Sequence, residues 1–260
     1  KQDIGGTLDS VASITSDHLK AIHAAYYRPG SLSLTVAGDF DEDRILTDLL
    51  EFLPDQPGPE IKSIFPDEPE NVVREKSVLR MDISSPSFLC GIKDPDILPH
   101  KIKSGLDLVG RQRAARLMFD TLLSPVSPVY ETLYSEGLIN ESFGYHYACE
   151  NSFAFLAIGG ESPEPEKASE RLVELLMMAI ESGLDKKMFD IQKRAAAGDF
   201  VRSLDAVEHS GMVQAQCNLH KVDLFDYPLL YDKMDAAAAD FMLSFLRDRA
   251  NYSVSIVREQ

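Results

Sequence analysis

Six histidines are the residues that first suggest metal binding or general-base chemistry. On a helix, the spacing of His18 and His23 places the two side chains about 140° apart around the axis, so they cannot share a metal ion. Neither HExxH nor HxxEH occurs, and His209 and His220 have no partner at a ligand spacing. The sequence therefore predicts no metal site and no bound cofactor in this chain.

Motifs that bind nucleotides or position a nucleophile are also missing from the sequence. It contains no GxSxG, GxxxxGK[ST] or GxGxxG pattern. Gly159 and Gly160 could hold an anion at the start of a following helix, but Glu161, Glu164 and Glu166 place negative charge there. We interpret the glycine pair as a turn.

Arg111, Arg113 and Arg116 form a small basic cluster in an acidic protein. A peptide carboxylate is one ligand that closely spaced arginines bind well. A solvated helix face is the other interpretation. The residue types alone leave both open.

The composition limits the partners of the chain. Lys and Arg number 26 against 42 Asp and Glu, giving a net charge of -16, so the chain repels phosphate backbones and anionic lipid. No apolar stretch approaches the 18 or so residues of a membrane span, and the first residues show no signal pattern. We expect no nucleic acid partner, no membrane partner and a cytoplasmic location.

Three cysteines, Cys90, Cys149 and Cys217, lie far apart and form no CxxC pair. Thiols of this kind are usually buried in cores. We expect reduced, largely buried side chains without a redox or zinc role.

The first part of the chain predicts helix, strand and helix in that order. Thr15 has the character of an N-cap with Asp17 in the first turn, so we expect a helix as far as Tyr27. Alternating hydrophobic residues predict a strand over 32–36, and helical spacing returns over 41–53.

A domain boundary is predicted at residues 54–70. This segment combines five prolines with several carboxylates, a composition that favours an extended linker. The linker divides the chain into a first part, 1–53, and a second domain, 71–260.

The second domain is predicted to mix helices and strands. The β-rich runs 143–149 and 152–158 are separated by Glu150-Asn151 and predict a hairpin. A helix is expected to open at Ser162, with Pro163 in its first turn, and to stop at Gly183. Other expected elements are a strand within 72–92, helices over 101–123, 184–204, 206–218 and 236–247, and a strand over 252–257. The expected buried residues of the 101–123 helix are Leu106, Val109, Leu117, Met118 and Leu122.

The two ends of the chain resemble each other. Ser33-Leu34-Thr35-Val36 and Ser253-Val254-Ser255-Ile256 lie 220 positions apart, each after a predicted helix and a polar break. This repeat predicts two copies of one unit, of which the chain holds the end of the first copy and all of the second.

Several segments of the chain together carry a resemblance to a known family. In the first part they are Ile4-Gly5-Gly6-Thr7, Tyr26-Tyr27-Arg28-Pro29-Gly30-Ser31 and Val36-Ala37-Gly38-Asp39, and in the second part they are the stretch from Tyr130 to Leu138 and the following Phe143-Gly144-Tyr145. The first three resemble the end of the first domain of the insulinase-like, or processing-peptidase-like, zinc peptidases. The later segments resemble the region before the hairpin of that family's second domain. The resemblance extends over essentially the whole chain.

The resemblance implies an α+β fold, an α/β sandwich with an antiparallel-rich sheet covered by helices, preceded by the tail of a homologous first domain. In this family one domain carries zinc on an HxxEH motif, and a related domain lacks metal and helps to bind the peptide. In several relatives the metal-free half contributes an Arg and a Tyr to that binding. Tyr145 matches the Tyr, but Tyr134 stands where the Arg is expected, at a longer spacing.

Our leading hypothesis is therefore the non-catalytic, substrate-holding part of a zinc metallopeptidase. Its implied partners are a peptide substrate and a zinc-bearing homologous domain or subunit outside this chain, and its implied substrate-binding residues are Tyr145 and Tyr134. The chain alone is expected to be inactive. The alternatives are a standalone scaffold subunit of a processing-peptidase-like complex and an unrelated acidic binding module.

Overall fold

A computed structural model describes residues 4–52, 62, 64, 65, 69, 71–97, 104–236, 239 and 243–260. The chain divides into two compact units. The first unit combines residues 1–64 with residues 207–219, and the second combines residues 65–206 with residues 220–260. The predicted linker over 54–70 falls largely outside the described residues.

The first unit is helical in its described part. Its helices are α1 (Leu8–Ala12), α2 (Ser16–Tyr26), α3 (Glu42–Phe52) and α8 (Val207–Leu219), with a 3-10 turn at Pro29–Ser31. The Thr15 side chain caps α2 by accepting a hydrogen bond from the His18 backbone N–H at 3.3 Å, as an N-cap residue does. The helices expected over 15–27, 41–53 and 206–218 are confirmed to within two residues.

The prediction of a strand over 32–36 is wrong. This segment has no regular secondary structure, and Leu32 and Leu34 are 59% and 63% exposed. Alternation predicts a strand only where a neighbouring strand supplies hydrogen bonds and a core covers one face. Among the described residues of the first unit there is no such neighbouring strand.

The second unit is built on a five-stranded sheet with the order β1-β5-β2-β4-β3. β1 and β5 are parallel, and the other pairs are antiparallel. The predicted antiparallel-rich sheet and the 143–158 hairpin, formed by β3 and β4, are confirmed. The single strand expected within 72–92 is two strands separated by a turn. The strands are β1 (Lys76–Met81), β2 (Ser87–Lys93), β3 (Gly144–Cys149), β4 (Ala154–Glu161) and β5 (Tyr252–Glu259).

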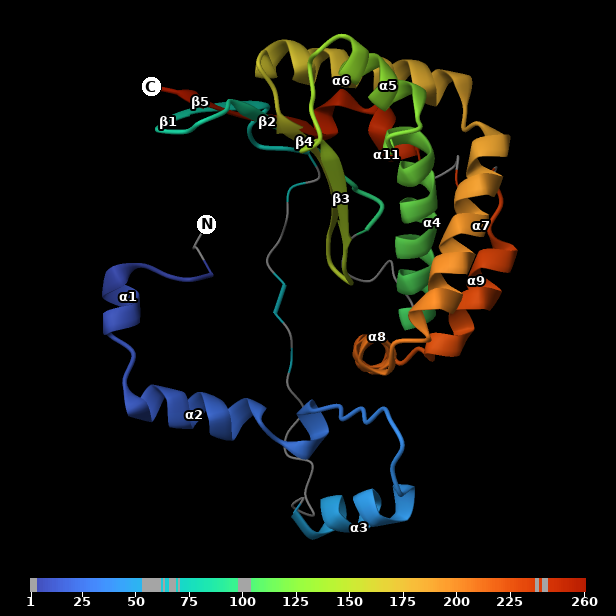
Figure 1. The fold of residues 1–260 in the computed structure, drawn as a ribbon. Coiled ribbons are helices and arrows are strands. Elements are labelled where there is room, and N and C mark those ends of the chain that lie inside the picture. The colour runs from blue at the N-terminus through green and yellow to red at the C-terminus, as the bar shows by residue number, and fades with distance from the viewer. Residues whose placement is uncertain are drawn as a thin grey trace. The chain divides into compact units, whose positions relative to one another are not determined.

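Helices cover one face of this sheet. α6 packs on β2 and β5, and α4 packs on β3, while α7 and α9 lie against α4 (Figure 1). The second unit contains α4 (Gly105–Leu123), α5 (Pro128–Ser135), α6 (Pro165–Ser182), α7 (Lys186–Ser203), α9 (Tyr227–Lys233) and α11 (Ser244–Arg247). Short 3-10 turns occupy Leu224–Asp226 and Arg249–Asn251.

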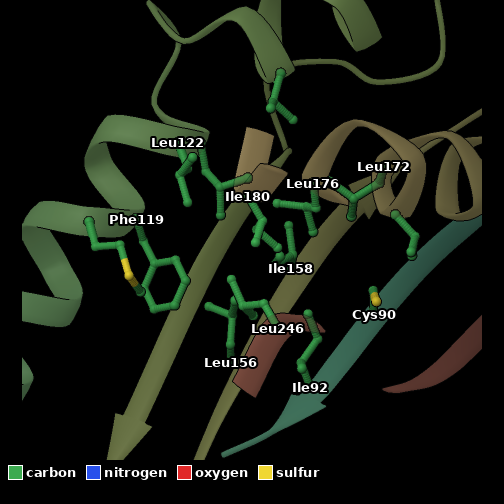
Figure 2. Close-up of a cluster of buried hydrophobic side chains, with 14 of the residues drawn as sticks. Cys90, Ile92, Phe119, Leu122, Leu156, Ile158, Leu172, Leu176, Ile180 and Leu246 are labelled. Carbon is green, nitrogen blue, oxygen red and sulfur yellow. The ribbon is translucent and has the colours of Figure 1, made fainter. Parts of the chain in front are cut away.

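The core forms where the helices meet the covered face of the sheet (Figure 2). Cys90 and Ile92 of β2 are fully buried and alternate with more accessible neighbours, as expected for a strand with one covered face. They belong to one core cluster with buried side chains from α4 and α6, including Phe119, Leu172 and Leu176. Burial of each large side chain contributes about 1.5–3 kcal/mol, so this layer fixes α4 against the sheet.

The helix after the hairpin begins later than predicted. Its N-cap is Glu164, and Pro165 occupies the first helical turn. Ser162 lies before the helix, and its backbone N–H donates to the Pro86 carbonyl at 2.9 Å, which keeps it beside the sheet. The predicted stop at Gly183 is confirmed, with φ of 76° at the C-cap.

The interpretation of Gly159 and Gly160 as a turn is wrong, because both residues lie inside β4. A Cβ atom on Gly159 would stand 2.0 Å from the Phe88 carbonyl oxygen, and one on Gly160 would stand 2.8 Å from the Phe143 backbone nitrogen. Glycine is therefore required here by the close approach of neighbouring backbones.

The expected buried face of the 101–123 helix is partly confirmed. Val109, Leu117, Met118 and Leu122 are buried in α4, whereas Leu106 is 42% exposed. Residues 98–103 lie outside the described residues, as does much of the helix expected over 236–247. The predicted C-terminal strand is confirmed as β5.

Candidate functional site

A groove lies between α4 and the outer strand β3, with a volume of about 410 Å³. In the described part of the sheet, β3 pairs only with β4. Its other edge carries backbone N–H and C=O groups that an extended peptide can pair with. The groove is lined by Gln112, Arg116, Asp120, Tyr145, His146 and Tyr147.

Tyr145 is the sequence-predicted residue that the structure places in this groove. Its ring packs against Phe119 with centroids 5.6 Å apart, and its hydroxyl donates to Asp120 Oδ1 at 2.5 Å. Burial, followed by the hydrogen bond and the negative charge of Asp120, raises the pKa of Tyr145 well above its usual range. The phenol therefore keeps its proton and remains a hydrogen-bonding group, while its ring belongs to the core.

Tyr134, the second predicted residue, lies on α5 and does not line the groove. Its side chain is 54% exposed, and its ring stacks on Tyr130 with centroids 5.8 Å apart. The structure gives the two predicted tyrosines different surroundings, one in the groove and one on an exposed helix face.

The three arginines do not form one basic site. The Arg111 guanidinium donates to Asp94 Oδ2 at 2.6 Å, and the Tyr147 hydroxyl donates to the same oxygen at 2.7 Å. Arg113 lies over the Tyr227 ring at 4.3 Å, a cation–π contact. The structure therefore separates Arg111 and Arg113 from the groove, and only Arg116 lines it.

Two carboxylates that sequence reasoning missed organise this region. Asp120 lies one helical turn after Arg116, and its Oδ2 is 3.5 Å from Arg116 Nε; the i, i+4 spacing was the available signal. Asp94 has a fully buried side chain and follows β2 in the sequence. No local pattern marks Asp94, because its partners Arg111 and Tyr147 are distant in sequence.

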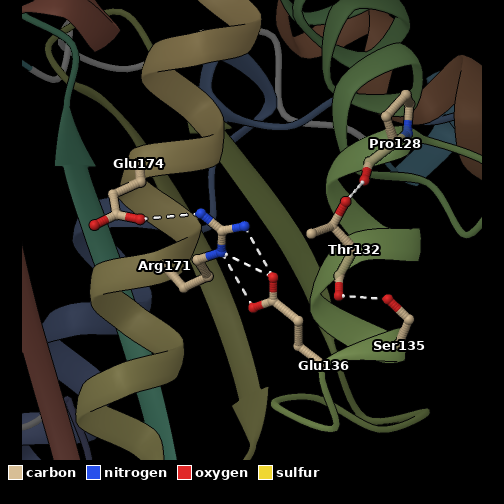
Figure 3. Close-up of polar contacts among 6 residues, drawn as sticks. All are labelled: Pro128, Thr132, Ser135, Glu136, Arg171 and Glu174. Atoms are coloured by element: carbon tan, nitrogen blue, oxygen red, sulfur yellow. Dashed lines mark hydrogen bonds and ion pairs between the residues drawn. The ribbon is translucent and has the colours of Figure 1, made fainter.

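A second polar cluster holds the segment that leads to β3 (Figure 3). Arg171 of α6 donates from Nε and Nη2 to the Glu136 carboxylate, the latter contact at 2.8 Å, and from Nη1 to Glu174 at 3.1 Å. The hydrogen bonds from Arg171 lower the pKa of Glu136. The bidentate geometry ties the end of α5 to α6.

The cysteines are buried, as predicted. Burial raises the pKa of Cys90 to about 12 and that of Cys149 to about 11. Thiols that remain protonated are poor nucleophiles and poor metal ligands.

Within the described residues, no group of three or more His, Cys, Asp or Glu side chains is arranged to hold a metal ion. A zinc site needs at least three such protein ligands, so these residues do not fit a resident zinc. Among the described residues, no helix combines the length and the apolar character that a membrane span requires.

The chain matches known proteins along most of its length. Residues 13–196 match the family described as the peptidase M16 inactive domain. A relative from Bacillus subtilis (strain 168), described as "Uncharacterized zinc protease YmfH", is 30% identical over 227 residues, covering 86% of this chain and 52% of the relative. The chain thus spans about half of that relative.

Solved structures agree with this assignment. A putative M16-like peptidase from Alicyclobacillus acidocaldarius is 25% identical with a TM-score of 0.88, and the match covers 100% of this chain and 62% of that one. A protease from Helicobacter pylori shares the fold, with 15% identity, a TM-score of 0.81, and coverage of 97% and 61%. On the family match and the Bacillus relative together, this chain belongs to the M16 peptidase family and carries its inactive domain.

Proposed function

We propose that this chain is the substrate-holding, non-catalytic part of a zinc-dependent peptidase. In this proposal a homologous half outside the chain carries the HxxEH motif and the zinc ion, and the two halves form a clamshell around a peptide. Residues 1–53 are the end of a first homologous domain, 54–70 are a linker, and 71–260 are the metal-free second domain. The family membership and the position of β3 at the edge of the described sheet support this division of roles.

The observation that carries the proposal is the outer edge of β3, which pairs with no further strand among the described residues, beside a polar groove. A peptide must be extended before its amide can be presented to a metal-bound water, and addition to a sheet edge imposes that conformation. The hydrogen bonds involve only main-chain groups, so this edge can hold peptides of many sequences.

Tyr145 is proposed to contact the bound peptide from the groove. Its O–H donates a hydrogen bond to Asp120, which leaves the lone pairs of its oxygen to accept a hydrogen bond. Tyr134 is proposed as a second contact through its exposed ring on α5. The distinct surroundings of the two residues support separate roles rather than a joint clamp.

Peptide binding to the chain tests the holding role directly. Fluorescence anisotropy with a labelled extended peptide is expected to show saturable binding. The matched control is the same peptide with N-methyl groups on alternate amides, which removes donors for the edge. Equal affinity for both peptides would exclude strand addition, and no binding of either would contradict the holding role.

A further inference from the structure

Arg116 is the member of the arginine cluster that lines the groove. Arg111 is bound to Asp94, and Arg113 is stacked on Tyr227. The side chain of Arg116 is 52% exposed. Its one recorded partner in the described part of the chain is Asp120, through Nε. The two terminal nitrogens of its planar guanidinium therefore remain available, and this is the face that binds a carboxylate.

Asp120 limits what Arg116 can bind. Its Oδ1 accepts a hydrogen bond from the Tyr145 hydroxyl and its Oδ2 faces Arg116 Nε, so both oxygens are used within the groove. A single arginine beside a carboxylate, in a chain with a net charge of -16, favours a planar ligand of single charge over a phosphate. A carboxylate meets these conditions.

The geometry of a strand edge places alternate peptide side chains in the groove. Tyr145 and Tyr147 are two residues apart on β3, so both project from the same face of the sheet. A peptide added to β3 shares that face, and every second side chain lies on the side of α4. A carboxylate at one of these positions lies on the same side as Arg116.

We propose that Arg116 binds a carboxylate of the extended peptide and so gives the groove a preference for acidic peptides. This inference depends on the proposed holding role of β3. The carboxylate has two chemical sources, an acidic side chain within the peptide and a free C-terminus. Both would accept two parallel hydrogen bonds from the guanidinium.

Three peptides of about ten residues, a length that matches a long strand, separate these sources. The first alternates threonine with glutamine, carries glutamate in place of one central glutamine, and has an amidated C-terminus. The second alternates threonine with glutamine and is amidated. The third is the glutamine peptide with a free C-terminus. Anisotropy titrations use the 260-residue chain as wild type, as Arg116→Gln and as the control Arg202→Gln. Arg202 is an exposed arginine of α7, paired with Asp199 at 2.9 Å, that does not line the groove.

The expected result is that wild type and Arg202→Gln bind a carboxylate peptide at least about fivefold more tightly than the amidated glutamine peptide, a modest ratio because Arg116 is half exposed. Arg116→Gln is expected to lose that ratio while keeping its affinity for the amidated glutamine peptide. Preference for the first peptide assigns the carboxylate to a side chain, and preference for the third assigns it to the C-terminus.

Two results would overturn the inference and are distinguishable from failure of the holding role. If all three peptides bind equally and N-methylation abolishes binding, β3 holds peptides and Arg116 does not select them. If the carboxylate preference survives in Arg116→Gln, another cation provides it. If no peptide binds the wild-type chain, both proposals fail.

Discussion

The hydroxyl of Tyr145 on β3 donates a hydrogen bond to Oδ1 of Asp120 on α4 at 2.5 Å. This contact joins the outer strand of the sheet to the helix that forms the other wall of the groove. Because Phe119 packs the same ring from the core side at 5.6 Å, the hydroxyl is held in one place.

Tyr145→Phe is predicted to weaken peptide binding and turnover in the assembled enzyme without unfolding the chain. The substitution keeps the ring contacts and removes one part-buried hydrogen bond, a loss of about 1 kcal/mol. Thermal unfolding and peptide titration measure the two effects. Tyr252→Phe is the control, because its hydroxyl donates to the Leu246 carbonyl at 2.6 Å in the core. It should lower stability and leave peptide affinity unchanged. Unaltered kinetics in Tyr145→Phe would make this residue purely structural.

Gly159→Ala is predicted to destabilise the second unit by at least about 3 kcal/mol, because the new methyl group overlaps the backbone of β2 and overpacking is costly. The control is Gly198→Ala on α7, where the added atom meets nothing within 4 Å. That change should stabilise the helix by about 0.5–1 kcal/mol. Chemical denaturation compares the two, and equal stabilities would show that β4 and β2 do not approach as described.

Asp94→Ala is predicted to cost about 3–5 kcal/mol, since it leaves the Arg111 charge without its buried partner. Asp96→Ala is the control, because it removes the second, solvent-exposed carboxylate beside Arg111. Asp96 is 44% exposed and 3.7 Å from Arg111 Nη2, so its removal should cost under about 1 kcal/mol. A similar loss in both variants, measured by urea denaturation, would contradict a special role for the buried pair.

The contact between Glu136 and Arg171 is predicted to stabilise the fold in a pH-dependent way. The pKa of Glu136 is lowered in the folded state, so its contribution is present above the unfolded pKa of about 4.3 and is lost as the pH falls through the folded value. Glu136→Gln should therefore shift the urea midpoint at neutral pH and lose this effect in acid. Arg171→Gln removes the same contact and should show the same pH trend. If the change in urea midpoint were the same at every pH, the negative charge of Glu136 would not contribute to stability.

Local signals predicted much of the fold. Thr15 caps its helix as expected, and the β3–β4 hairpin follows from two β-rich runs around Glu150-Asn151. The strand expected over 32–36 failed because strand formation depends on a partner, which the segment's own alternation cannot reveal. The prediction of a turn at Gly159 is wrong for a similar reason. Glycine is needed there because the backbones of two strands distant in sequence come close together.

The candidate site was predictable only in part. Tyr145 was identified through family resemblance, and Arg116 was visible as one of three arginines with two open interpretations. What the sequence could not show is that Arg111 and Arg113 each have a separate partner and that only Arg116 faces the groove. The partner of each arginine is determined by tertiary contacts, which the local sequence does not reveal.

Reconstitution with the proposed zinc-bearing half decides whether this chain is the substrate-holding, non-catalytic part of a zinc-dependent peptidase. Peptide cleavage is measured for this chain alone, for the other half alone and for the mixture, each with and without a metal chelator. We predict cleavage in the mixture that exceeds the activity of either half and is abolished by the chelator. Cleavage by this chain alone that resists the chelator would contradict the account.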